Sequence, residues 1–144
     1  MTIVKLTRAS REAAKDISSL LAQLREDPSE HKAALSELRD ITTNKNVVFI
    51  VAKDGKKIVG MAMLYVMQKL GKRIAYVEDV VVLSEYRGRG LGEKIMRAII
   101  ATARAKKVRT LNLTSRPARV AANKLYQKLG FEQKETNVYR MKFK

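Results

Sequence analysis

The 144-residue sequence predicts an α/β (α+β) fold, in which about four helices flank a central mixed, mostly antiparallel sheet of six to seven strands. Segments rich in β-branched residues alternate with segments of helical periodicity, in the order strand, two helices, three strands, helix, strand, helix, two strands. The length suits one hydrophobic core. No linker, repeat or low-complexity stretch divides the chain, so we expect a single domain over residues 1–144.

The N-terminal third contains one expected strand and two expected helices. Residues 3–6 alternate weakly between apolar and polar side chains and form the strand. Ser10 suits the N-cap of the first helix, because apolar residues then recur at helical spacing. The Asp-Pro pair at residues 27–28 ends this helix. A second helix restarts at residue 29 or 30 and ends near residues 44–46.

Three strands joined by short turns form the middle of the expected sheet. The Asp-Gly pair at residues 54–55 is typical of a hairpin, and the turn at residues 70–72 contains another glycine. Gly60 lies inside the middle strand, where a bulge or a close approach of another segment favours glycine. The expected strands cover residues 47–52, 58–67 and 73–83.

The C-terminal part is expected to add two helices and three strands. A helix over residues 93–106 carries an apolar stripe, and a short strand over residues 108–114 follows it. Pro117 suits the first turn of the last helix, and Gly130 suits its C-terminal end. The two closing strands are expected over residues 131–133 and 137–143.

A glycine-rich run at residues 86–92 joins an expected strand to an expected helix. This arrangement presents backbone N–H groups to a phosphate, and Arg87 and Arg89 add positive charge. The run lacks the Gly-Lys-Ser/Thr end of a Walker motif. The dinucleotide fingerprint also fails, because the glycines are two residues apart and residues 110–113 contain no carboxylate. The run therefore favours phosphate binding, with a plain flexible turn as the alternative.

The net charge of +16, from 30 basic and 14 acidic residues, attracts anions. The basic residues are spread along the chain, and the few aromatic residues do not alternate with them in a base-stacking pattern. We therefore expect an acidic cofactor or substrate, and we do not expect specific nucleic-acid binding. A basic nucleic-acid-binding domain is the less favoured alternative.

Several classes of protein are disfavoured by what the sequence lacks. Without cysteine there are no disulfides, thiolate catalysts or zinc–thiolate sites. His31, the only histidine, is interpreted as a solvated surface residue, and no metal is expected. No apolar run is long enough to span a membrane, and the N-terminus does not resemble a signal peptide. We expect a cytoplasmic protein without a membrane partner, and a homodimer is left open.

Two segments, VLSEYRGRGLG at residues 82–92 and ANKLYQKLGF at residues 122–131, strongly resemble the acetyl-CoA-binding motifs of the GNAT N-acetyltransferase superfamily. The expected element order is also similar, so the resemblance spans essentially the whole chain. It implies an acyltransferase that transfers the acetyl group of acetyl-CoA, its co-substrate, to a primary amine. Because no cysteine can form an acetyl-enzyme, we expect direct attack in a ternary complex.

The resemblance implies roles for named residues. Backbone amides of residues 87–92 would hold the pyrophosphate. The end of the preceding strand would pair with the pantetheine arm and hold the thioester carbonyl, while a bulge separates this strand from residues 111–114 and leaves a gap for the cofactor. Many relatives carry Asn-x-x-Ala at the start of the last helix, where this chain has Arg119 instead; we prefer Asn123 for the contact to the cofactor arm, with Arg119 as the alternative. The implied cofactor-binding residues are Val80, Val81, Val82, Arg87, Gly88, Arg89, Gly90, Leu91, Gly92 and Asn123.

The reaction needs a base and an acid. An amine attacks a thioester only when it is neutral, so a base must take its proton, and an acid must then protonate the leaving thiolate. Glu78, directly or through water, is the first candidate for the base, and Asp79 is the second; a structural pairing with a basic side chain is the alternative for each. Strand alternation places Glu78 on the face of Tyr76, Val80 and Val82, and Asp79 on the other, unless a bulge exchanges them. By resemblance, Tyr126 would protonate the leaving thiolate, with ordinary helix packing as the alternative.

The acceptor is left open by the sequence, with a small-molecule amine favoured over a protein amine. Residues 78–82 are similar to the corresponding strand of amino-sugar-phosphate acetyltransferases, and a basic surface suits a phosphorylated acceptor. The end of the chain does not resemble those enzymes. A non-catalytic acyl-CoA-binding regulatory module is the alternative function.

Overall fold

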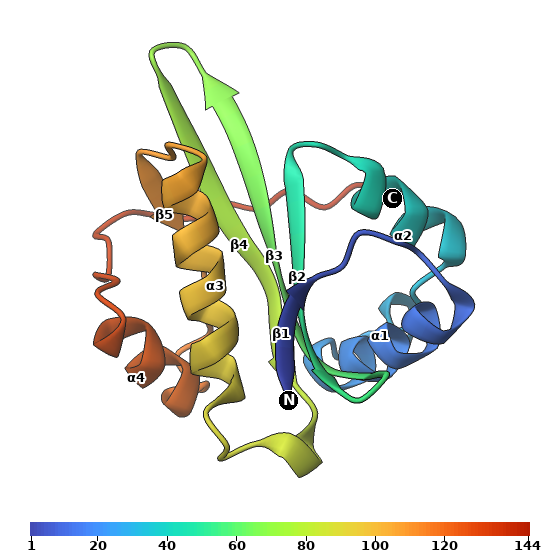
Figure 1. Ribbon diagram of the computed structural model, residues 1–144. Coiled ribbons are helices and arrows are strands. Elements are labelled where there is room, and N and C mark those ends of the chain that lie inside the picture. Colours follow the sequence, from blue (N-terminus) through green and yellow to red (C-terminus); the bar gives the residue numbers. More distant parts are fainter. The chain divides into compact units, whose positions relative to one another are not determined.

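The computed structural model describes residues 1–144 and contains one five-stranded sheet (Figure 1). The strand order follows the chain order, and each of the first four strands is antiparallel to its neighbour, whereas the last is parallel to the fourth. The predicted mixed, mostly antiparallel α+β fold is confirmed, with five strands in place of six to seven. The strands are β1 (Thr2–Lys5), β2 (Val47–Asp54), β3 (Lys57–Lys69), β4 (Lys72–Val82) and β5 (Thr110–Asn112).

Four α-helices and two short 3-10 helices complete the fold. The Ser10 hydroxyl accepts a hydrogen bond from the Ala13 N–H at 3.1 Å, so the predicted N-cap of the first helix is confirmed. The helices are α1 (Arg11–Leu24), η1 (Pro28–Glu30), α2 (Leu35–Thr43), η2 (Ser84–Tyr86), α3 (Leu91–Ala105) and α4 (Val120–Lys128). Figure 1 shows α1 and α2 on one face of the sheet and α3 on the other. No helix has the length and apolar character that a membrane crossing requires.

Contacts divide the chain into two units, Met1–Leu113 and Thr114–Lys144. The first unit contains the sheet, α1, α2 and α3, and the second contains α4 and the C-terminal tail.

The second helix differs from its prediction, because it is interrupted. The Asp27 carboxylate accepts a hydrogen bond from the Ser29 N–H at 2.9 Å and caps only the single turn of η1. The next residues leave the helical path, since the Ala33 N–H donates to the Ser18 hydroxyl of α1 at 2.9 Å. Helix α2 therefore begins only at Leu35.

The two predicted closing strands, residues 131–133 and 137–143, are wrong. These residues form no strand, and four apolar side chains in the tail are exposed. A strand exists only where a neighbouring strand accepts and donates its backbone hydrogen bonds. Alternation of residue types is present here, but residues 133–136 contain no glycine or Asn-Gly pair that would close a hairpin. The exposed side chains are Val138, Tyr139, Met141 and Phe143.

The core of the first unit lies on both faces of β2 and β3, whose central side chains are almost fully buried. Gly60 of β3 lies where α3 crosses the sheet. A Cβ atom at Gly60 would lie 2.9 Å from the Cδ1 atom of Ile95. The register of β2 and β3 also shifts beside Gly60, between Ala52 and Lys53. Both predicted reasons for a glycine at this position, a bulge and a close approach, are confirmed.

Candidate functional site

Strand β4 contains a bulge at the two candidate bases. Its register with β3 pairs Met63 with Glu78 and Met61 with Val81. Strand β4 therefore has one residue more than β3 between these pairs, which is the pattern of a β-bulge. Within the bulge the Asp79 backbone is left-handed, with a φ of 54°, a conformation that few residues other than glycine adopt.

The bulge changes which residues share a face with Glu78. Glu78 lies on the face of Tyr76, as predicted, since their partners in β3 are two residues apart. Val82 is on the opposite face, because it pairs with Gly60, whose Cα faces α3; here the simple alternation was wrong. Val81 takes the place beside Glu78. Glu78 therefore faces the side of the sheet that α1 covers.

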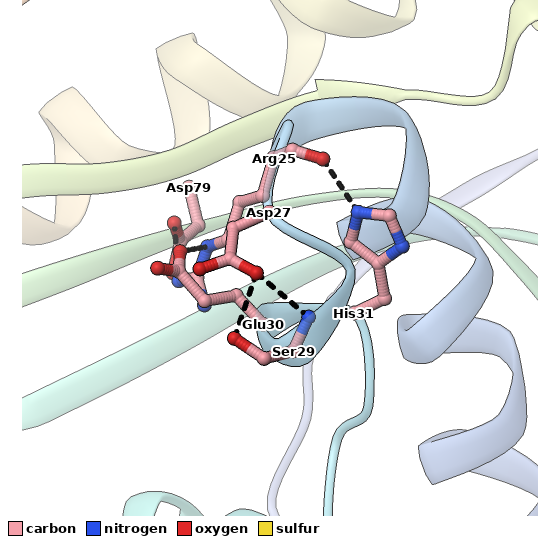
Figure 2. A network of polar contacts seen from close by, with 6 residues as sticks. All are labelled: Arg25, Asp27, Ser29, Glu30, His31 and Asp79. Atoms are coloured by element: carbon pink, nitrogen blue, oxygen red, sulfur yellow. Dashed lines mark hydrogen bonds and ion pairs between the residues drawn. The ribbon is translucent and has the colours of Figure 1, made fainter.

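Asp79 pairs with a residue far away in the sequence. The Arg25 side chain, directly after α1, donates from one terminal nitrogen to both carboxylate oxygens of Asp79, at 3.0 and 3.1 Å (Figure 2). The Asp79 side chain is only 17% exposed, so this ion pair compensates a partly buried charge. Asp79 thus fits the structural alternative better than the role of base.

Glu78 is exposed on the sheet and has a pKa above the ordinary value of a glutamate. Partial burial is the largest cause, and the neighbouring Asp79 carboxylate raises the pKa further, whereas the Arg25 guanidinium lowers it. A carboxylate whose pKa is moved towards neutral pH is suited to accept a proton from an amine.

Tyr65 of β3 joins this group of side chains. It pairs with Tyr76 and so lies on the face of Glu78, diagonally across the strands. Burial raises its pKa, the carboxylates of Asp79 and Glu78 raise it further, and Arg25 lowers it. The Tyr65 phenol therefore stays protonated at neutral pH, and its hydroxyl donates to the Met63 sulfur at 3.5 Å.

Beyond its pairing with β5, β4 has an edge without a strand neighbour. β5 pairs only with residues 74–76, so residues 77–82 have β3 on one side and no strand on the other. The resemblance predicts that a bulge separates β4 from residues 111–114; the structure differs at Leu111 and Asn112, which still pair with Ala75 and Tyr76, and the edge of β4 is without a strand neighbour only beyond Tyr76. Because the Leu83 N–H donates to Val59 of β3 at 2.8 Å, alternation turns the backbone groups of Val82 towards the outer edge. There the Val82 carbonyl accepts hydrogen bonds from Gln23 and Arg87.

The end of β4 continues through η2 into the glycine run. Gly88 and Gly90 have φ angles of 78° and 75°, so both lie in the left-handed region. Gly90 is the N-cap residue of α3 and supplies no side-chain acceptor to the N–H groups of the first turn. A Cβ atom at either glycine would meet no protein atom within 4 Å. Glycine is therefore required here by the backbone conformation and not by crowding.

Side chains hold this loop from two directions. The Tyr86 hydroxyl donates to the Asp54 carboxylate in the β2–β3 turn at 2.7 Å. The Arg89 guanidinium lies over the Tyr86 ring, 4.9 Å from its centre, and also donates to the Glu85 carbonyl. Arg87 donates to Val82. Both arginines are thus ordered beside a helix N-terminus without a side-chain cap, an arrangement that fits a pyrophosphate.

Two predicted residues, Asn123 and Tyr126, belong to α4 in the second unit. The Asn123 side-chain nitrogen donates to the carbonyls of Arg116 and Arg119, at 2.9 Å each. Both of its hydrogens are used, so only an acceptor contact through its oxygen remains for a cofactor arm. Burial raises the pKa of the Tyr126 phenol, and nearby Arg119 lowers it. The Tyr126 ring packs edge-on against Phe131, with 6.0 Å between ring centres.

Sequence reasoning missed Arg25, Tyr65 and Gln23, and misread His31. The His31 ring is not simply solvated, because its Nε2 atom donates to the Arg25 carbonyl at 2.6 Å. Arg25 is separated from Asp79 by 54 residues, and no local pattern links them. Tyr65 is placed near Glu78 by the register of β3 and β4, which is regular from their turn to Glu78, so counting back from that turn could have found it.

Comparison with known proteins identifies the family. Residues 14–131 match the Acetyltransferase (GNAT) family. A glucosamine 6-phosphate N-acetyltransferase from Trypanosoma brucei brucei is 31% identical over 128 residues, covering 83% of this chain and 85% of the relative. The crystal structure of a Trypanosoma brucei acetyltransferase has a TM-score of 0.76 and 26% identity, covering 99% of each chain. This chain belongs to the GNAT acetyltransferase family, and the resemblance of its two motifs is confirmed.

The fold is shared more widely than the sequence. An aminoglycoside acetyltransferase from an uncultured soil metagenomic sample has a TM-score of 0.84 at 16% identity, covering 99% of this chain and 98% of that one. At this identity the likeness concerns the fold alone. The names of these two proteins include different acceptors, so the shared fold does not define the acceptor of this chain.

Proposed function

We propose that this chain transfers the acetyl group of acetyl-CoA to the primary amine of a small phosphorylated amino sugar, by direct attack in a ternary complex. The single observation that carries the proposal is β4 itself. One strand presents Glu78 on its α1 face, an outer edge without a strand neighbour, and the glycine run that opens α3. An acyl carrier lying along that edge would have its diphosphate at α3 and its thioester near the bulge.

In the proposed reaction each proton has a named destination. The amine nitrogen attacks the thioester carbon, the C–N bond forms, and Glu78 takes the amine proton directly or through water. A backbone N–H at the end of β4, such as the outward N–H of Val82, would stabilise the negative carbonyl oxygen. The C–S bond then breaks, and Tyr126 would donate its phenolic proton to the thiolate. Its raised pKa supports this role, since the phenol is protonated at neutral pH.

A phosphorylated amino sugar is supported by two considerations. The relative from Trypanosoma brucei brucei is named for glucosamine 6-phosphate. The net charge of +16 attracts an anionic acceptor and repels a lysine-rich protein tail. The family match extends across both units, so we take residues 1–144 together as the active N-acetyltransferase domain.

The test measures thiol release from acetyl-CoA with three acceptors: glucosamine 6-phosphate, glucosamine and a lysine-containing peptide. We expect the phosphorylated sugar to have the highest kcat/KM. Glu78→Gln should lower kcat about 10²-fold or more, while Glu135→Gln in the exposed C-terminal tail should leave it unchanged. Binding of acetyl-CoA in calorimetry without release of thiol from any acceptor would instead support the non-catalytic regulatory module.

A further inference from the structure

We infer that Arg25 is a positioning residue for Glu78, and this inference rests on the proposed role of Glu78 as the base. By binding Asp79, Arg25 holds the β4 bulge, and this bulge places Val81 beside Glu78 on the α1 face. Its positive charge also offsets the Asp79 carboxylate, which would otherwise oppose ionisation of Glu78.

Arg25 links three segments of the first unit (Figure 2). Its N–H donates to the Leu21 carbonyl at 2.9 Å and ends α1. Its carbonyl accepts the hydrogen bond from His31, beyond η1, at 2.6 Å. Its side chain binds Asp79 of β4, and its Nε atom lies 3.9 Å from a Glu30 carboxylate oxygen of η1. The guanidinium is therefore held at both ends and has a defined place over the bulge.

The bulge needs such a partner. Asp79 has a left-handed backbone inside a strand, a conformation that, among residues other than glycine, is adopted mainly by Asn and Asp. Removing its partner would also leave a carboxylate that is 17% exposed without compensation. If the bulge relaxed to regular pairing, the residues after it would exchange faces. Glu78 would then lose its present relation to Val81.

The charges around Glu78 determine in which direction each substitution should shift its pKa. Asp79 of β4 and Arg25 act on it directly, Tyr65 of β3 is its uncharged neighbour, and Glu30 and His31 lie behind Arg25. Loss of the Asp79 charge should make Glu78 easier to ionise, and loss of the Arg25 charge should make it harder. A purely mechanical role for the ion pair would not produce shifts of opposite sign.

The experiment follows the ¹³C carboxyl resonance of Glu78 through a pH titration of the full chain, and compares it with the acid limb of kcat/KM for glucosamine 6-phosphate. We expect Asp79→Asn to move the pKa of Glu78 and the acid limb down, and Arg25→Gln to move both up, each by about 0.5–1 pH unit. Asparagine tolerates the left-handed region and its amide oxygen can still accept a hydrogen bond from Arg25, so Asp79→Asn retains the bulge. Arg25→Lys keeps the charge and should remain near the wild-type values.

Arg97→Gln is the matched control. It removes the same unit charge and also breaks an ion pair, to Glu93 at 2.9 Å, but on the exposed surface of α3. The titration of Glu78 should not change in this variant. The inference is overturned if Arg25→Gln and Asp79→Asn shift the titration in the same direction, or leave it unmoved.

A different result would contradict the proposed function. If Glu78→Gln retains wild-type turnover and its acid limb, Glu78 is not the base, whatever Arg25 does to its titration. Should Arg25→Gln not fold, the downward shift in Asp79→Asn and the unchanged titration of Arg25→Lys still decide the electrostatic part. An unshifted Asp79→Asn would then contradict the inference.

Discussion

Substitution of Gly90 by alanine tests the site where we expect the diphosphate of acetyl-CoA. Gly90 has a φ of 75° and directly precedes the first turn of α3. Alanine in the left-handed region costs roughly 1–2 kcal/mol. Because a Cβ atom here would meet no protein atom within 4 Å, this cost comes from the backbone and not from a clash.

The free protein can relieve this strain by moving the loop, but binding must restore the conformation that aims the N–H groups at the ligand. The strain then appears in the dissociation constant. A cost of 1–2 kcal/mol corresponds to an increase in Kd of roughly five- to thirtyfold. Calorimetry with acetyl-CoA measures this change directly. Gly90→Glu should abolish binding, because a carboxylate would lie beside the diphosphate.

Gly71→Ala provides a matched control for strain alone. Gly71 lies in the β3–β4 turn with a φ of 81°, and a Cβ atom there also meets nothing within 4 Å. Only the change at Gly90 should weaken acetyl-CoA binding, and Gly71→Ala should retain the wild-type Kd. A wild-type Kd for Gly90→Ala, or an equal loss of affinity in Gly71→Ala, would refute the assignment of the loop.

Much of the fold is predictable because local chemistry decides it. Ser10 caps α1, the glycine run precedes α3, and Gly130 follows α4 with a φ of 100°. Each of these features depends on residues within one turn of the chain. The same is true of the hairpin at residues 54–55, where Gly55 has a φ of 60°. Such features are readable because no distant contact is needed to define them.

The site is predictable only in part, because its geometry depends on pairing between distant segments. Glu78 could be selected from the chemistry of amine attack, but which of the following residues share its face depends on the bulge opposite Ala62. Asp79 could not be recognised as the partner of Arg25, since no local pattern connects them. The prediction of two closing strands was wrong because it, too, depended on pairing that local sequence does not show. A period of two residues predicts a strand, but a strand also needs a neighbour.

Three further changes probe packing, the phosphate loop and proton donation. Gly60→Val should lower the free energy of unfolding by about 1–3 kcal/mol, because its side chain would press on Ile95; a denaturant titration measures this. Tyr86→Phe removes the hydrogen bond to Asp54 and should raise KM for acetyl-CoA a few-fold at unchanged kcat in steady-state kinetics. Tyr126→Phe should lower kcat about 10²-fold and leave the Kd of acetyl-CoA unchanged. Phenylalanine retains the ring packing, so only proton donation is lost. The kcat of Tyr126→Phe should therefore recover with a thioester whose leaving thiolate needs no proton. Equal turnover in Tyr126→Phe would leave this tyrosine as a packing residue of α4.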